Sequence, residues 1–442
     1  MPLPTRTTSL AIILIASLTL ASFIGIRHLK LTGKNNCNFV DSNEILQPCT
    51  TGLEAPPDAP DPSRPQKPLA FQEGLNRPFP PASPLVTDPV ALSPRKIQVA
   101  VLLDVSNSMD GLIEQAKAQL WNMVSVLGRV RCDGKVPQVE IALYEYGRSS
   151  NDVSKGYVEQ VNPFTRDLDE VSKNLFRLTT NGGDEYCGQV MYTSLKELKW
   201  DDSMDNYKVI FIAGNEDFLQ GRLPFTTACR EAKAKGVVVN TIYCGERKQG
   251  IAEHWNLGAE CGNGSFTNIN SDARIEDIPT PYDDELFQLN TRLNATYISY
   301  GTKGEESMAK MSEVDGLNFE SNKSAALKRV GVKSKKEVYD NSSWDLVDAM
   351  AADSMVVRKL DKSQLPVTLK NKSEKEIRQF VKTQSEERWS IQKQIAALSI
   401  KRDTFLAAEK AKNIKSNHES TLETAIEKMI REQIGKKGMK LE

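Results

Sequence analysis

The sequence has no excess of charge of either sign, and this narrows the range of partners. Its 442 residues include 57 Lys and Arg against 58 Asp and Glu, a formal net charge of −1. A protein that binds nucleic acid normally carries a basic excess. We therefore expect no nucleic-acid partner.

Histidines and closely spaced cysteines are also few. The three histidines, at positions 28, 254 and 418, lie near no plausible nucleophile, so we do not expect an enzyme. The seven cysteines, at positions 37, 49, 132, 187, 229, 244 and 261, form no close metal-binding pairs, which argues against a zinc ribbon or finger. Cys187, Cys229 and Cys244 are expected to be either disulfide-bonded or small buried side chains.

Uncharged apolar sequence occurs in one long run near the N-terminus. Residues 9–26 are eighteen positions without a charge, preceded by Arg6 and followed by Arg27. This length is at the threshold for a transmembrane helix. Residues 1–34 are thus predicted to be a membrane anchor or a cleaved signal peptide. The basic residues after the run favour a cytoplasmic location for the rest of the chain, but a first apolar segment is most simply an export signal. We expect the remainder on the extracytoplasmic side, or secreted if the segment is cleaved.

Residues 35–95 change to proline, alanine and short polar residues, as in Ala55-Pro56-Pro57-Asp58-Ala59-Pro60. Such a segment cannot bury enough apolar surface to fold, and prolines hold it extended. It is predicted to be a linker that holds the next domain away from the membrane.

Residues 96–275 alternate apolar strands with helical patterns. Strands are predicted at 97–103, 139–146, 208–213, 237–243 and 265–269, and helices at 111–127, 168–178, 188–198, 223–234 and 251–259. Continuous apolar strands separated by helices indicate a largely parallel sheet that is covered on both faces. The predicted fold class is therefore α/β, with a doubly wound, Rossmann-like sheet.

The C-terminal part is polar and rich in predicted helix. Residues 276–372 form a helix-rich extension, and Ser373 to Glu376 has the form of a capping box that opens a further helix. Apolar residues then recur at three-four spacing, with gaps at Gln384, Arg388 and Arg402. Residues 373–442 are predicted to form a helical hairpin or coiled coil that can self-associate. A solvated helical tail without a partner is the alternative.

The first predicted strand ends in Asp104-Val105-Ser106-Asn107-Ser108. One carboxylate and two hydroxyls are the hard donors that Mg²⁺ or Ca²⁺ prefers, and ligands collect at this end of the strands in open α/β sheets. A plain turn or helix cap is the alternative, because Asp and Ser are common capping residues.

The order of elements, together with this turn, resembles the von Willebrand factor A (VWA) domain of bacterial proteins over about residues 96–275. The resemblance implies that Asp104, Ser106 and Ser108 are the first part of a metal-ion-dependent adhesion site. In that family a threonine and an aspartate from two later loops complete the site, and a partner commonly supplies a carboxylate.

Both later loops depart from the family. Matching the Gly182-Gly183 pair places Asp184 where the family has threonine, and Gly214 stands at the usual aspartate position. Glu216 or Asp217 is expected to reach the metal instead, directly or through water, and Glu216 is taken as the predicted ligand. The predicted metal ligands are therefore Asp104, Ser106, Ser108, Asp184 and Glu216, which hold Mg²⁺ or Ca²⁺.

These features predict a protein-binding module for adhesion or assembly, displayed at a membrane. One alternative is a metal-free scaffold that acts through its C-terminal helices. A metal-dependent hydrolase is the other alternative, although a two-metal enzyme needs more carboxylates than these loops offer.

Overall fold

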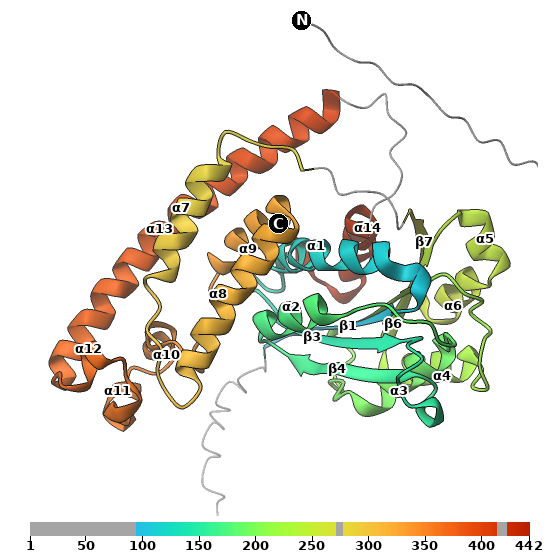
Figure 1. The fold of residues 1–442 in the computed structure, drawn as a ribbon, viewed down its shortest axis with the longest axis horizontal. Helices are drawn as coiled ribbons and strands as arrows, with labels where there is room; N and C mark the ends of the chain where they lie inside the picture. The colour runs from blue at the N-terminus through green and yellow to red at the C-terminus, as the bar shows by residue number, and fades with distance from the viewer. Residues whose placement is uncertain (1–93, 271–276, 413–421) are drawn as a thin grey trace, which may run out of the picture. The chain divides into compact units, whose positions relative to one another are not determined.

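A computed structural model describes residues 94–270, 277–412 and 422–442 (Figure 1). The predicted membrane segment over residues 1–34 and the predicted linker up to residue 93 lie outside the described residues. Within the described ranges, no helix combines the length and the apolar character needed to cross a membrane.

A six-stranded sheet forms the centre of the α/β part, in the strand order β4-β3-β1-β5-β6-β7. β1 lies between β3 and β5 and is parallel to both, and β6 and β7 continue the parallel run. β4 pairs with β3 in the antiparallel direction at one edge. The strands are β1 (Lys96–Asp104), β3 (Gln138–Tyr146), β4 (Val158–Thr165), β5 (Tyr207–Gly214), β6 (Val237–Cys244) and β7 (Asn263–Ile269).

Helices cover both faces of this sheet, as predicted (Figure 1). Successive side chains of a strand point to opposite faces, so Val99 and Leu103 of β1 pack with α1, α2 and α14, whereas Ala100 and Leu102 pack with α3, α4 and α6. The helices are α1 (Asp110–Leu127), α2 (Leu168–Arg177), α3 (Cys187–Glu197), α4 (Phe225–Lys235), α5 (Arg247–Ala252), α6 (Trp255–Cys261) and α14 (Leu422–Ile434). The doubly wound, mostly parallel α/β fold is therefore confirmed.

Two local predictions were wrong. β4 was not predicted, because it is an edge strand with a half-exposed, polar sequence that contains Pro163. Proline has no N–H to donate and is tolerated at a sheet edge. The helix predicted over residues 251–259 is broken into α5 and α6 at His254, whose φ of 63° is left-handed.

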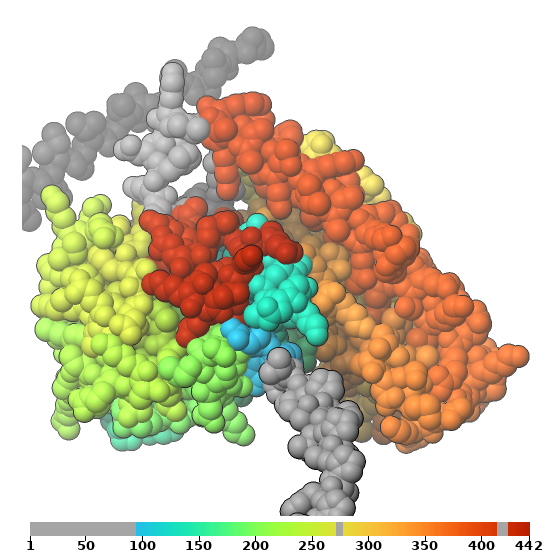
Figure 2. Space-filling view, turned by 180° about the vertical axis from the view of Figure 1, so that it is seen from behind, coloured from blue at the N-terminus to red at the C-terminus, as the bar shows by residue number. Residues whose placement is uncertain are grey.

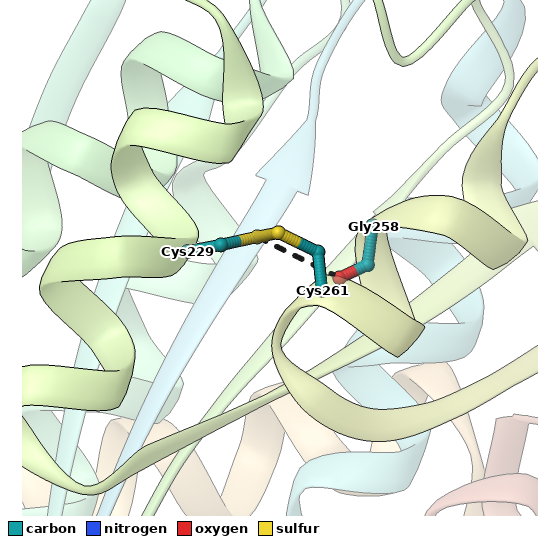
Figure 3. Close-up of a disulfide and its surroundings, with 3 residues drawn as sticks. All are labelled: Cys229, Gly258 and Cys261. Carbon is teal, nitrogen blue, oxygen red and sulfur yellow. Dashed lines mark hydrogen bonds between the residues drawn. A yellow bond between two sulfur atoms is a disulfide. The ribbon is translucent and has the colours of Figure 1, made fainter.

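A disulfide joins Cys229 of α4 to Cys261 at the end of α6 (Figure 3). It links two helices on the same face of the sheet. Cys132, Cys187 and Cys244 are free and buried. Of the two alternatives for these cysteines, Cys229 is therefore bonded, whereas Cys187 and Cys244 are small buried side chains.

The last residues of the chain belong to the α/β part. α14 packs on α1 and β7, and the short strand β8 (Lys440–Leu441) pairs with β2 (Val130–Arg131). Figure 2 shows these C-terminal residues in dark red against the segment that follows α1. Gln433 of α14 reaches the sheet, where it accepts a hydrogen bond from the Tyr207 hydroxyl at 2.8 Å.

A group of helices fills the sequence between β7 and α14. They are α7 (Asp283–Asn294), α8 (Gly304–Ser321), α9 (Lys323–Lys333), α10 (Leu346–Ala352), α11 (Val356–Lys359), α12 (Val367–Lys370) and α13 (Glu374–Lys412). α9 packs on α1, α8 packs on α2 and α9, and α13 lies along α7. These contacts connect the helical extension to the α/β part.

The helical hairpin predicted over residues 373–442 differs from the observed packing of α13 and α14. The main contacts of α13 are with α7, α10, α11 and α9, whereas those of α14 are with α1 and β7. The two arginines that interrupt the predicted apolar seam of α13 explain why this helix packs on earlier helices. Arg388 and Arg402 are buried on this face and pair with acids outside α13: Asp345, which caps α10, Asp348 of α10 and Asp283 of α7. The seam is therefore matched to acidic partners from earlier in the chain.

Candidate metal site at the end of the first strand

The turn after β1 is held in place by its neighbours on both sides. The Val105 N–H donates to the Tyr146 carbonyl of β3 at 2.9 Å, and the Val105 carbonyl accepts from the Asn181 N–H at 2.9 Å. The Asp104 side chain is fully buried, and its Oδ1 accepts a hydrogen bond from the Ser106 N–H at 2.8 Å. The turn is thus positioned by main-chain contacts to β3 and to the second loop.

The two serines lie on the solvent side of Asp104. Ser106 is buried and Ser108 is exposed, and their Oγ atoms are 3.3 Å apart. The Asn215 side-chain amide, from the loop after β5, donates to Ser108 Oγ at 3.1 Å. Asn215 was not among the predicted site residues. Its contact brings the first and third loops together.

The second loop contributes a different acid from the predicted one. Asp184 is exposed, and its Oδ2 accepts a hydrogen bond from the Tyr186 hydroxyl at 2.9 Å. Glu185 is buried at 8% exposure. A Cβ atom on Gly147 would lie 2.9 Å from Glu185 Cγ and 3.0 Å from Asp104 Oδ1, so these two side chains meet over Gly147. Of these two neighbours, Glu185 is therefore the buried acid beside Asp104, whereas Asp184 faces solvent.

The glycine pair alone does not decide which of these neighbours faces Asp104. Consecutive residues of an extended loop point to opposite sides, so a shift of one residue exchanges the inward and the outward acid. Glu185 lies two residues before the start of α3 at Cys187. Counting back from that helix, instead of forward from the glycines, is the signal that would have found it.

The third loop has no room for the aspartate of the family. A Cβ atom on Gly214 would lie 2.6 Å from the Tyr146 hydroxyl and 3.0 Å from Asp104 Oδ2. The Tyr146 side chain is fully buried, and its hydroxyl donates to the Ala213 carbonyl at 3.0 Å. Tyr146 therefore explains why position 214 is glycine.

Glu216 lies farther out but still acts on the site. It is exposed, and its Oε2 accepts a hydrogen bond from Gln220 at 3.3 Å. Its negative charge nevertheless raises the pKa values of both Asp104 and Glu185. Glu216 is thus an exposed acid that lies near enough to act on the charges of Asp104 and Glu185.

Asp104 and Glu185 are perturbed in the same direction. Burial is the largest cause in each case, and the pKa rises to about 6 for Asp104 and to about 7 for Glu185. The charged groups that contribute most to both shifts are other acids. The Asn215 N–H lowers the Asp104 pKa slightly, but Asp104 Oδ2 is buried and accepts no hydrogen bond of normal geometry from the described residues. A buried carboxylate oxygen of this kind needs a partner.

A hard divalent cation fits these donors. Asp104 and Glu185 would provide carboxylate oxygens, and Ser106 and Ser108 would provide hydroxyls, which is the oxygen-only chemistry of Mg²⁺ and Ca²⁺. A cation would also relieve the repulsion between the acids. Within the described ranges, no group of three or more His, Cys, Asp or Glu side chains that could hold a metal ion is found. The serine hydroxyls are therefore essential to any such site.

Comparison with known proteins adds similarities of fold. No family model matches the chain, and no curated protein matches it. Among solved structures, an aerotolerance-related membrane protein from Bacteroides fragilis is 16% identical, with 40% of this chain and 93% of that chain covered and a TM-score of 0.29.

Two further solved structures are similar over the same share of the chain. A von Willebrand factor type A protein from Catenulispora acidiphila is 16% identical over 40% of this chain and 39% of that chain, with a TM-score of 0.30. Proximal thread matrix protein 1 from the mussel byssus, with a zinc-occupied metal-ion-dependent adhesion site, is 13% identical over 40% and 42%, with a TM-score of 0.31. VWA domains are thus among the structures that this chain is similar to. The fold itself is defined by the strand order and helix layers described above.

Proposed function

We propose that this chain binds a protein partner through a divalent cation held at the turn after β1. The observation that carries the proposal is the buried Asp104 Oδ2, which has no hydrogen-bond partner among the described residues and lies beside other acids. Asp104 and Glu185 would neutralise the two charges of the ion, and Ser106 and Ser108 would add neutral oxygens. The ion would serve to bind the partner, and no catalytic step is proposed.

The partner would approach from the side of Ser108 and Glu216, the exposed members of the set. An ion that is neutralised by two buried carboxylates can accept one more oxygen from outside. A carboxylate on the partner would fill this position if Glu216 stays in solvent with Gln220, where it has its described hydrogen bond. Glu216 then adds negative charge near the ion without ligating it.

Metal binding is tested by calorimetric titration of the full chain with Mg²⁺ and with Ca²⁺. Asp104→Ala and Glu185→Gln should each weaken binding by about tenfold or more, the effect of losing about 1.4 kcal/mol. Asp184→Asn is the matched control, because it removes a neighbouring acid whose side chain faces solvent. No binding of either ion, or equal binding by the wild type and Asp104→Ala, would contradict the proposal. A larger effect of Asp184→Asn than of Glu185→Gln would contradict the assignment of ligands.

Display outside the cytoplasm is part of the same proposal. The Cys229–Cys261 disulfide supports it, since such bonds persist in oxidising compartments and are rare in the cytosol. Thiol labelling of the chain in intact cells, with and without reductant, tests this. Two further reactive thiols, those of Cys229 and Cys261, are expected after reduction, and no gain of thiols on reduction would contradict it.

A further inference from the structure

The long helix α13 has two faces with different surroundings. One face packs on the neighbouring helices and buries Ile377, Val381, Arg388, Ile391, Ile395, Leu398 and Arg402. The opposite face is exposed and carries large apolar side chains, with Trp389 60% exposed and Ile400 68% exposed. α13 is drawn in orange-red in Figures 1 and 2. An exposed tryptophan and isoleucine on one face of a helix indicate a surface for another helix.

The exposed face has a regular repeat. Eight residues recur at alternating spacings of three and four, and all eight are exposed; this set, the α13 seam, is Glu386, Trp389, Lys393, Ala396, Ile400, Asp403, Ala407 and Lys410. Alternating three and four is the spacing that keeps a helix face in contact with a partner helix along its length. At a rise of 1.5 Å per residue the α13 seam is about 36 Å long.

The α13 seam is complementary to itself when two copies run in opposite directions. With the two-fold axis at the level of Leu398, Trp389 of one copy faces Ala407 of the other, and Ala396 faces Ile400. Each large side chain therefore meets a small one. The same alignment places Lys393 opposite Asp403 and Glu386 opposite Lys410, so both charged pairs are of opposite sign.

A parallel arrangement lacks this complementarity. In a parallel pair each residue would face the same residue of the second chain, so Trp389 would meet Trp389, Lys393 would meet Lys393 and Asp403 would meet Asp403. Like charges directly opposite each other are destabilising. A two-fold interface also uses the same patch on both chains, which an antiparallel seam satisfies. We propose that two copies of this chain associate through antiparallel contact of their α13 seams.

The contacts that these side chains make within one chain are weak enough to be exchanged. Lys393 Nζ lies 3.4 Å from the centre of the Trp389 ring, Asp403 pairs with Lys328 at 2.9 Å, and Glu386 pairs with Lys382 at 3.8 Å. Ion pairs between exposed side chains contribute about 0–1 kcal/mol each. Association would also keep the buried side of α13 intact, because none of the eight seam residues is buried.

The oligomeric state of the full chain tests the proposal. Sedimentation equilibrium should show a reversible dimer, and Trp389→Glu with Ile400→Glu should weaken dimerisation by about tenfold or more. Thr383→Glu with Ala408→Glu is the matched control, since it adds the same charge at exposed positions outside the α13 seam. Unchanged circular dichroism and thermal unfolding would show that each variant is folded.

A charge exchange tests the direction of pairing. Lys393→Glu alone should weaken the dimer, and adding Asp403→Lys should restore it, because the two positions face each other only in the antiparallel arrangement. A monomer at concentrations up to about 100 µM would overturn the proposal. So would a dimer that the seam variants leave unchanged, while a lack of rescue by the double exchange would overturn the antiparallel pairing. Dimerisation that persists in chelator would leave this proposal standing even if the metal site fails.

Discussion

Replacing Arg388 by methionine should strongly destabilise the protein, because this guanidinium joins α13 to the α7–α10 region in a buried network. The side chain is 5% exposed and donates to Asp345 Oδ2 at 2.6 Å and to Asp348 Oδ1 at 3.0 Å. It also donates to the Thr296 carbonyl at 2.7 Å and stacks on the Tyr297 ring at 4.2 Å. Methionine keeps most of the length but removes every donor.

The expected loss of stability follows from the carboxylate of Asp345, which stays buried without its guanidinium partner. Asp345 is fully buried, and removal of one partner of a buried ion pair costs about 3–5 kcal/mol. Two main-chain donors remain, since the N–H groups of Ile298 and Asp348 both donate to the Asp345 carboxylate. These bonds place the expected loss in the lower half of that range, about 3 kcal/mol.

The assay is the free energy of unfolding from urea denaturation at pH 7, for the wild type and for Arg388→Met. Glu387→Met is the control, because Glu387 is the exposed neighbour on the same helix. Adding Asp345→Asn should recover part of the loss, since the unpaired charge is then removed. A loss below about 1 kcal/mol for Arg388→Met, or no recovery in the double variant, would refute the reasoning.

Two further predictions concern the metal site and the C-terminal helix. In chelator, Asp104→Asn should become more stabilising as the pH rises from 4 to 7.5, reaching about 3 kcal/mol. The reason is that burial raises the Asp104 pKa to about 6, so the wild type loses stability as that carboxyl ionises. Thermal unfolding over this pH range checks the prediction, and a difference in stability that does not change with pH would contradict it. Gln433→Leu should lower the free energy of unfolding by about 2–4 kcal/mol, because it leaves Tyr207 and Asn240 buried without their partner. Urea denaturation checks this, and a loss under about 0.5 kcal/mol would count against it.

Much of the α/β fold could be predicted from local sequence. The β5 residues Val209 to Ile212 form a continuous apolar run, and all eight residues of β5 are buried. A strand with both faces apolar needs cover on both sides, so the helix layers followed from the strand pattern. β4 escaped prediction because its half-exposed edge position imposes no such pattern.

The candidate site could be predicted only in its first loop. Asp104, Ser106 and Ser108 are close in sequence, so their spacing alone brings their oxygens together. The contact of Asn215 with Ser108 and the exclusion of a side chain at Gly214 by Tyr146 depend on how separate loops meet. No local spacing contains that information.

The sequence by itself determined the alternation of strands and helices, and with it the position of the Asp104 turn at the carboxyl end of β1, because hydrophobic periodicity acts within one element. The tertiary structure alone decided where α13 and α14 pack. Arg388 looked like a gap in an apolar seam, yet it is buried because Asp345 and Asp348, about forty residues away, neutralise it. A buried charge depends on a partner in space, and that partner can be anywhere in the chain.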